Sequence, residues 1–258
     1  GNTYQHSNNP DVVREAGRIT GQFLQGMATL APTALKTTIK SLADEGRGGS
    51  DFHNVNWRYE EFRHSLASGN RQRIRQSQSL IKLVEQHIGR VKDIYHRIVS
   101  TTPLRAMHND TKLSNIRFTP DKQSSCLVDY DTLMPGYLAL DYGDALRTIG
   151  SRCAEDDRQL QRVGFDLPRI ARYAAGFGQV WHAITRQEAT LLAQAVCYMP
   201  FLMGLRMLTD YLNGDVYYHT DWPTHNYDRA ANQLTLYQKG LAQLSGIEEI
   251  TNRYFFIT

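Results

Sequence analysis

The chain has 258 residues, of which 41% are hydrophobic and 21% are charged. This is enough for one large domain or two small ones with a buried core. The net charge of +3 is spread without a run of like charge, which argues against a dedicated nucleic-acid binder. The longest apolar stretch, residues 191–205, is interrupted by Gln194 and Pro200 and is shorter than the roughly 18 to 20 residues that span a bilayer. We therefore expect no membrane span and no nucleic-acid partner.

Three cysteines, Cys126, Cys153 and Cys197, lie far apart without the paired spacing of a metal or redox site. Residues 1–10 are polar and lack the basic start and apolar core of an export signal. We expect buried, reduced thiols and a cytoplasmic protein.

The sequence up to residue 100 predicts helices. Asn9, Pro10 and Asp11 combine a capping residue, a proline at the first helical position and an acid in the first turn. Apolar spacing carries this helix to about residue 29. A second helix is expected over residues 35–43, before a Gly-rich loop. Apolar residues at steps of three and four predict one long amphipathic helix over residues 71–100.

The middle of the chain has a different pattern. Residues 104–107, 116–118 and 126–128 are short apolar segments between turn residues, which is typical of brief strands. Helical patterns return over residues 167–184, 187–212 and 227–244. The predicted fold class is mainly α with a small β element, an α+β single domain.

The predicted strands suggest a metal site. If residues 116–118 and 126–128 pair as an antiparallel hairpin, Asn115 just before the first strand and Asp129 just after the second lie side by side. An amide oxygen and a carboxylate are hard donors that suit Mg²⁺, which takes few protein ligands and keeps waters or substrate phosphates. Asn115 and Asp129 are therefore the predicted metal ligands.

The residues before this hairpin suggest phosphoryl transfer. Asp110 lies five residues before Asn115, close enough to orient a substrate hydroxyl and accept its proton. Lys112 can place a positive charge on the transferred phosphoryl group. The segment has the His-x-Asp-x-x-x-x-Asn spacing of a kinase catalytic loop. We expect Asp110 and Lys112 to be catalytic, and His108 to hold the loop's backbone rather than touch substrate.

Two acids that follow the loop have a simpler role. Asp141 and Asp144 are expected to bind backbone N–H groups of the loop rather than substrate. No zinc spacing, nucleophile elbow or dinucleotide-binding fingerprint occurs in the sequence.

Several segments carry a family resemblance. Residues 108–115, 128–131 and 140–144 resemble the aminoglycoside phosphotransferase and choline kinase superfamily of kinase-like folds. The resemblance is closer to N-acetylhexosamine 1-kinases, and it rests on residues 51–54 with Arg58 and Tyr59, on residues 108–115 and 129–136, and on residues 204–218. It implies the helical lobe of a protein-kinase-like fold and phosphorylation of the anomeric hydroxyl of an N-acetylhexosamine, with ATP as co-substrate and Mg²⁺ as cofactor.

The resemblance also implies residue roles. It places sugar contacts at Arg206 and Tyr217, in addition to the base and metal ligands already predicted. From the residues alone, Arg206 followed by Asp210 and Asp215 indicates a structural ion pair, and Tyr217 could be a core aromatic.

Two residues after the Gly-rich loop have open roles. His53 and Asn54 either line the sugar site or fix that loop, and we include His53 among the candidate substrate-binding residues.

The family's nucleotide lobe has no counterpart in the sequence. Such kinases resemble one another in a small N-terminal lobe that covers the ATP phosphates, and the segment of residues 46–49 does not replace its glycine-rich loop. We therefore expect residues 1–258 to be a single substrate and metal lobe, which folds and binds sugar but does not phosphorylate it alone. The alternatives are an aminoglycoside or choline/ethanolamine kinase, or a non-catalytic module that binds a sugar or a partner protein.

Overall fold

The computed structural model describes residues 1–35, 51–121 and 125–255. The helices are α1 (Pro10–Met27), α3 (Val55–Ser68), α4 (Arg71–Gln76), α5 (Gln78–Thr101), α6 (Leu138–Ile149), α7 (Leu167–Gly178), α8 (Arg186–Asn213), α9 (His225–Ala242) and α10 (Leu244–Phe255). The strands are β1 (Arg105–Met107), β2 (Ile116–Phe118), β3 (Ser125–Leu127) and β4 (Met134–Gly136), with 3₁₀ turns at Pro32–Ala34, Leu113–Asn115 and Tyr130–Thr132. The predicted class, mainly α with a small β element, is confirmed.

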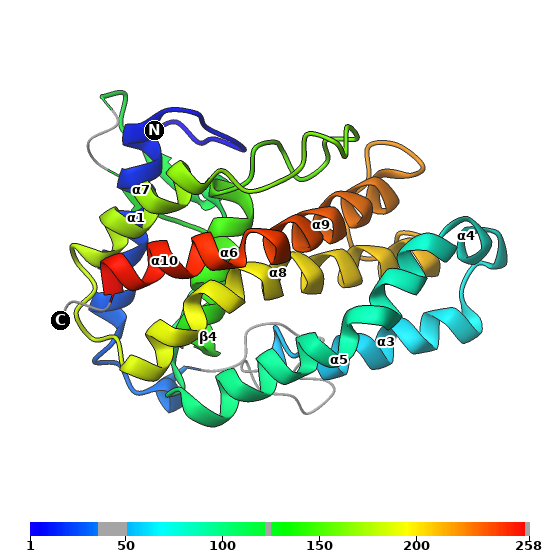
Figure 1. Cartoon of the computed structure of the whole chain (residues 1–258), viewed down its shortest axis with the longest axis horizontal. Helices are drawn as coiled ribbons and strands as arrows, with labels where there is room; N and C mark the ends of the chain where they lie inside the picture. The colour runs from blue at the N-terminus through cyan, green and yellow to red at the C-terminus, as the bar shows by residue number, and fades with distance from the viewer. Residues whose placement is uncertain (36–50, 122–124, 256–258) are drawn as a thin grey trace.

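Helix α8 is the centre of the core. Thr185 caps its first turn and forms a reciprocal capping box with Glu188, and Gly214 ends it in left-handed backbone geometry at φ 100°. The helix packs against α3, α5, α6, α9 and α10 (Figure 1). Among the described helices it alone is long and apolar enough to cross a membrane, but 94% of its apolar window is buried inside the protein. Its composition is therefore that of a core helix.

Helices α1 and α7 pack unusually closely. Asn9 caps α1 as predicted, because its Oδ1 accepts from the amide of Asp11 at 2.9 Å. A Cβ on Gly17 would lie 2.1 Å from the backbone oxygen of Tyr173, and one on Gly176 would lie 2.0 Å from that of Arg14. The two glycines thus allow backbone contact between the helices.

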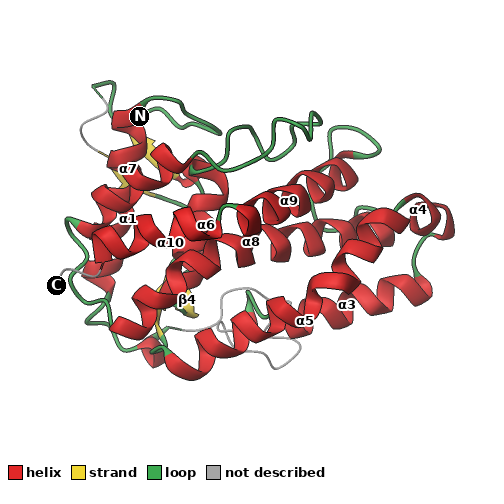
Figure 2. Cartoon of the chain, viewed as in Figure 1, coloured by secondary structure: helices red, strands yellow, loops and turns green. Residues whose placement is uncertain are grey.

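The strands form two small antiparallel pairs (Figure 2). β2 pairs with β3 in the register Ile116 with Leu127, so the predicted hairpin is confirmed, with β3 one residue earlier than expected. β1 pairs with β4, a pairing that the sequence analysis did not predict. Both pairs lie beside the loop of residues 108–115 and fix its two ends.

Three predicted helix boundaries are wrong. The expected helix over 71–100 is two helices, because Ser77 leaves helical geometry at φ −96° and ψ 9°. The helix expected over 227–244 ends at Ala242, where Gln243 also departs from helical geometry, and α10 follows. α7 ends at Gly178, before the expected residue 184. The apolar period continues through these breaks, and neither Ser77 nor Gln243 is a Pro or Gly that would mark an end.

The sequence analysis did not predict two of the helices, α3 and α6. Because α6 is buried on nearly every side, it lacks the amphipathic stripe by which a helix is recognised in a sequence. The helix expected over 35–43 lies outside the described residues except for Leu35, which follows the turn Pro32–Ala34.

One cysteine prediction is also wrong. Cys153 and Cys197 are buried as expected, but Cys126 is exposed. Cys126 pairs in register with Arg117 on β2, whose side chain also faces solvent, because alternate residues of a strand point to opposite faces.

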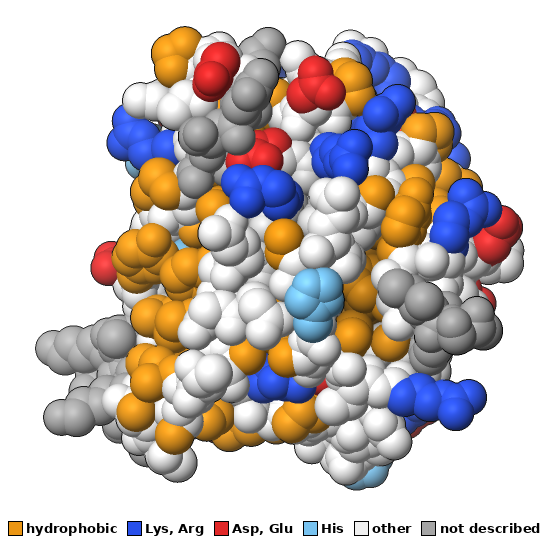
Figure 3. Space-filling view, turned by 90° about the vertical axis from the view of Figure 1, so that its left-hand side faces the viewer, with side chains coloured by type: hydrophobic (Ala, Val, Ile, Leu, Met, Phe, Trp, Pro, Cys, Tyr) orange, Lys and Arg blue, Asp and Glu red, His pale blue; other side chains and the backbone are white. Residues whose placement is uncertain are grey.

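On the face of the molecule shown in Figure 3, basic and acidic side chains are interspersed among apolar ones.

We predict that Gly17→Ala destabilises the protein by about 1 to 3 kcal/mol, because the added methyl meets backbone atoms that cannot move aside. Gly26→Ala is the matched control on the same helix, where a Cβ meets nothing within 4 Å. It should stabilise by up to about 1 kcal/mol through helix propensity. Urea unfolding midpoints measure both changes. Equal midpoints for the two variants would contradict the close approach of α1 and α7.

Candidate active site

The loop of residues 108–111 is held by the buried carboxylate of Asp141 on α6. Its two oxygens accept the backbone amides of His108 and Asn109 at 2.9 Å each, and the hydroxyl of Thr111 donates to the backbone oxygen of Asp141 at 2.6 Å. Burial and the neighbouring carboxylate of Asp144 raise the pKa of Asp141, and the two amide hydrogen bonds oppose this rise because they stabilise the ionised form. The predicted supporting role of Asp141 is confirmed.

His108 has the structural role that was predicted for it. Its Nε2 donates to the backbone oxygen of Val128 at 3.1 Å, and its Nδ1 accepts the amide of Asp110 at 3.3 Å. Burial lowers the pKa of His108, which favours the neutral ring that can accept at one nitrogen and donate at the other. The ring therefore ties the loop to the end of β3.

Asn109 fastens the loop to the β1 and β4 pair. It adopts left-handed geometry at φ 61°, which asparagine tolerates better than most residues. Its amide nitrogen lies within hydrogen-bond distance of the backbone oxygens of Met107, Thr132 and Met134. Asn109 and Thr111, the residues on either side of Asp110, are thus both anchored, and Asp110 projects from a rigid support.

The carboxylate of Asp110 contacts Lys112 and Asn115, the two other candidate residues of this loop. The Nζ of Lys112 lies 2.6 Å from Asp110 Oδ2, and the Nδ2 of Asn115 donates to the same oxygen at 2.8 Å. Asn115 Nδ2 also donates to the backbone oxygen of Asp110 at 2.9 Å. The carboxylate is therefore oriented by two donors, and its Oδ1 has no donor among the described residues.

The predicted metal ligands lie at neighbouring positions of the hairpin. The amide of Val128 donates to the backbone oxygen of Asn115 at 2.9 Å, which places Asp129 next to Asn115 at the open end. Asn115 uses its Nδ2 on Asp110, so its Oδ1 is left as an acceptor, and the exposed Asp129 adopts left-handed geometry at φ 68°. An amide oxygen and a carboxylate fit a Mg²⁺ ion that takes its other ligands from phosphates and water.

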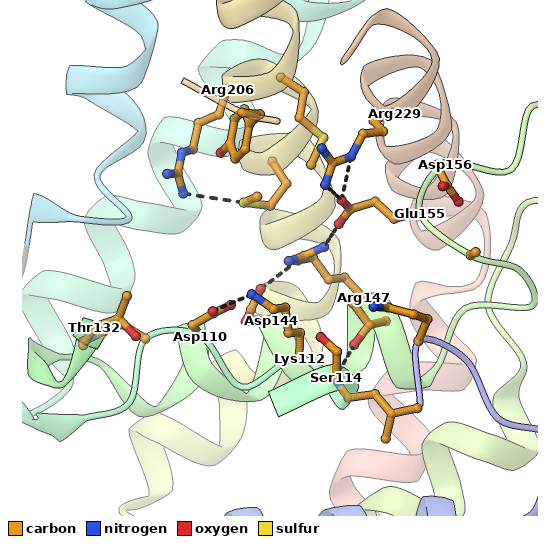
Figure 4. Close-up of a pocket in the computed structure, with 18 of the residues that line it drawn as sticks. Asp110, Lys112, Ser114, Thr132, Asp144, Arg147, Glu155, Asp156, Arg206 and Arg229 are labelled. Carbon is orange, nitrogen blue, oxygen red and sulfur yellow. Dashed lines mark hydrogen bonds and ion pairs between the residues drawn. The ribbon is translucent and has the colours of Figure 1, made fainter. Parts of the chain in front are cut away.

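A pocket of about 600 Å³ opens above the loop (Figure 4). Asp110 and Lys112 form its floor, and Arg206 projects from α8 on the opposite side. The predicted residues that line it are His53, Asp110, Lys112, Arg206 and Tyr217, whereas Asn115 and Asp129 do not line it. The structure thus brings the predicted base and the candidate substrate contacts to one cavity, with the predicted metal ligands beside it.

His53 lines this pocket, and its neighbour Asn54 does not. The Nε2 of His53 donates to the backbone oxygen of Asn109 at 3.0 Å, which leaves its buried Nδ1 without a hydrogen-bond partner among the described residues. Burial and the charge of Arg206 lower the pKa of His53 to about 3, so the ring is neutral. Asn54 caps α3 through the amide of Asn56. His53 therefore faces the pocket and holds the loop of residues 108–111 at Asn109, whereas Asn54 caps a helix. The Gly-rich loop that either residue was expected to fix lies outside the described residues.

A buried ion-pair network on the other side of the pocket was missed by the sequence analysis. Arg147 bonds Asp144 at 2.6 Å and also bonds Glu155, and Glu155 bonds Arg229 at 2.8 Å. Although burial opposes its ionisation, the two arginines lower the pKa of Glu155. Asp144 therefore pairs with Arg147 and does not bind the loop's amides, which corrects our expectation. The network joins α6, α9 and the segment between α6 and α7, a contact across the fold that local spacing does not reveal.

Arg206 is not in the ion pair that its sequence neighbours suggested. Asp215 pairs with Arg73, and Asp210 accepts backbone amides, so neither acid neutralises Arg206. Its guanidinium lies 5.1 Å from the ring of Phe52, and 5.9 and 5.8 Å from the rings of Tyr217 and Tyr218, distances at which a cation and a ring attract. Within the described part of the chain it forms no ion pair, and its one hydrogen bond is to the sulfur of Met203 at 3.6 Å.

Comparison with known proteins gives the family. Residues 1–173 match the family model described as the phosphotransferase enzyme family. Because this match spans more than half of the chain, the protein belongs to that family. The superfamily-level resemblance found in the sequence is thereby confirmed.

Solved structures give the fold. The chain is similar to an ethanolamine kinase of Plasmodium vivax at a TM-score of 0.59 and 12% identity, over 90% of this chain and 63% of that one. It is also similar to a choline kinase of Cryptosporidium parvum at a TM-score of 0.48 and 12% identity, over 95% of this chain and 69% of that one. The chain thus spans less than two thirds of the ethanolamine kinase, with which it shares a kinase-like helical architecture.

We predict that the stability of the protein depends on pH through His53. With a pKa lowered from 6.5 to about 3, the folded protein resists a proton that the unfolded chain accepts. The free energy of unfolding should therefore fall as the pH drops from about 6.5 towards 3, by at most about 1.4 kcal/mol per pH unit from this residue.

Urea unfolding of wild type and His53→Gln between pH 4 and 7 measures this contribution. The variant should have a flatter profile over this range, whereas His64→Gln, at an exposed position on α3, should follow the wild type. Parallel profiles for wild type and His53→Gln would show that His53 is not held neutral.

Proposed function

We propose that this protein is an ATP-dependent small-molecule kinase that phosphorylates the anomeric hydroxyl of an N-acetylhexosamine. The observation that carries the choice of acceptor is Arg206, the one pocket-lining cation among the described residues that has no carboxylate partner. Lys112, Arg147 and Arg229 are each paired with an acid. An unneutralised cation in the pocket favours an acceptor with oxygen lone pairs, such as the carbonyl of an acetamido group.

The same observation disfavours cationic acceptors. Choline, ethanolamine and aminoglycosides carry positive charge, and a site for them needs unpaired acids or an open aromatic cage. Here the rings of Phe52, Tyr217 and Tyr218 already surround the Arg206 guanidinium. A second positive charge at this place would be repelled.

Asp110 is the proposed base. The acceptor hydroxyl donates its proton to the Asp110 carboxylate as its oxygen forms a bond to the γ-phosphorus and the bond from that phosphorus to ADP breaks. Lys112 lies 2.6 Å from the carboxylate and supplies positive charge where the phosphoryl group transfers. His53 is neutral and lines the same pocket, so its ring places no positive charge against the acceptor.

Asn115 and Asp129 are the residues that would hold Mg²⁺. Their oxygens are the ligand type that Mg²⁺ prefers, and the ion would neutralise charge on the nucleotide phosphates. Because such a site takes its remaining ligands from phosphates and water, metal and nucleotide should bind together.

We predict that Asp110→Asn lowers kcat for sugar phosphorylation by roughly 10² to 10⁴, the usual contribution of a general base, while the protein stays folded. The assay uses protein expressed from its full reading frame, with Mg-ATP and N-acetylglucosamine or N-acetylgalactosamine, and follows sugar 1-phosphate by mass spectrometry. Asp93→Asn, on the exposed side of α5, is the control. Near-normal turnover by Asp110→Asn would remove this residue from the role of base.

We predict that Arg206→Met weakens N-acetylglucosamine binding about tenfold to hundredfold, because a charge-assisted hydrogen bond contributes about 1.5 to 3 kcal/mol. Isothermal titration measures the change. Arg186→Met replaces an exposed arginine at the start of the same helix and should leave the affinity unchanged. If wild type binds choline and not the sugar, the proposed acceptor class is wrong.

A further inference from the structure

The turn of residues 216–218 is held by a single buried carboxylate. Asp210, near the end of α8 and 5% exposed, accepts the backbone amides of Val216 and Tyr217 on Oδ1 and that of Tyr218 on Oδ2, each at 2.9 Å. Its Oδ2 also accepts the side-chain amide of Asn226 on α9 at 2.9 Å. Four donors thus compensate for the burial of one negative charge.

Apart from Asp210, the turn is held by Arg73 and Asn226, which bond the side chain of Asp215, and by the ring of Tyr218, which packs against the core. Val216 is 80% exposed and Tyr217 is 62% exposed, so apolar burial contributes little at these two positions. The chain enters the turn through two residues in left-handed geometry, Gly214 at φ 100° and Asp215 at φ 61°. Such a backbone conformation persists when neighbouring contacts enforce it, and Asp210 provides three of those contacts.

The turn forms one wall of the proposed acceptor site. Arg206 lies one helical turn before Asp210 on α8, so both side chains project from the same face of the helix. The rings of Tyr217 and Tyr218 lie 5.9 and 5.8 Å from the Arg206 guanidinium, and all three residues line the pocket. One helix therefore presents the cation and also holds the aromatic wall against it.

We propose that Asp210 is a positioning residue for acceptor specificity, which fixes the 216–218 turn so that Tyr217 and Tyr218 stand over Arg206. The proposal rests on the proposed function, since it assigns the wall to the same acceptor site. A wall that is rigid before binding loses less conformational entropy when a ring-shaped acceptor with one apolar face packs against it. Asp210 then raises acceptor affinity without touching the acceptor.

The first test needs no ligand. Amide hydrogen exchange, measured by NMR, should be at least about tenfold faster at residues 216–218 in Asp210→Asn than in wild type, because the variant replaces one acceptor oxygen by an N–H donor. Asp221→Asn is the control, since the exposed carboxylate of Asp221 lies in the same loop and bonds none of these amides. Unchanged exchange in Asp210→Asn would overturn the anchoring role. If that variant does not fold, Asp210→Glu, which keeps two acceptor oxygens but displaces them by one methylene, is measured in its place and should also accelerate exchange at residues 216–218.

The second test is a double-mutant cycle on acceptor affinity. Asp210→Asn and Tyr217→Ala should each weaken N-acetylglucosamine binding about tenfold, and the double variant should be little worse than either one, because Asp210 acts through the wall. Independent effects, which multiply to about a hundredfold, would overturn the proposal.

The two tests separate this proposal from the proposed function. If wild type binds no N-acetylhexosamine, the proposed function fails and the exchange experiment still decides the anchoring. The cycle is then run with whichever acceptor in a panel of sugars, choline and aminoglycosides binds wild type. A coupling that persists with that acceptor supports the positioning role, and its absence overturns it.

Discussion

The site depends on the buried carboxylate of Asp141. Two amides of the loop of residues 108–111 converge on its oxygens, and these bonds join the loop to α6, which packs on the central helix α8. Asn109 and His108 fasten the same loop to the two strand pairs. The position of Asp110 is therefore set by the core rather than by the loop itself, as expected of a group that must meet a reacting hydroxyl within a few tenths of an ångström.

The pocket above this loop has two electrostatically different sides. On one side Arg147 and Arg229 share Glu155, with Asp144 as a second partner of Arg147, and this side is neutralised internally. On the other side Arg206 has aromatic neighbours, and among the described residues no carboxylate lies within ion-pair distance of it. Arg206 is thus the arginine of the pocket without a carboxylate partner in the described part of the chain, and the choice of acceptor depends on its charge.

The sequence predicted the loop of residues 108–115 better than the fold around it. The spacing of Asp110 and Asn115 and the short strands of the hairpin are local features, and both are present as expected. The pairing of β1 with β4 and the network of Arg147 depend on residues far apart in the chain, so no local pattern revealed them.

Arg206 shows the limit of reasoning from neighbours in sequence. Asp210 and Asp215 lie near it on the chain, and local spacing favoured an ion pair. In the fold these acids bind backbone amides and Arg73 instead, because the left-handed entry at Gly214 and Asp215 turns the chain back over the helix. The family resemblance predicts a sugar contact at Arg206, which stays a prediction, and it gave no indication of the ion-pair network of Arg147.

A crystal structure of the chain with N-acetylglucosamine shows whether Asp110 and Arg206 act on one acceptor from opposite sides of the pocket. We expect the anomeric hydroxyl to lie about 2.6 to 3.2 Å from the Asp110 carboxylate, with the acetamido oxygen on Arg206. A sugar bound outside this pocket, or one that presents another hydroxyl to Asp110, would contradict it.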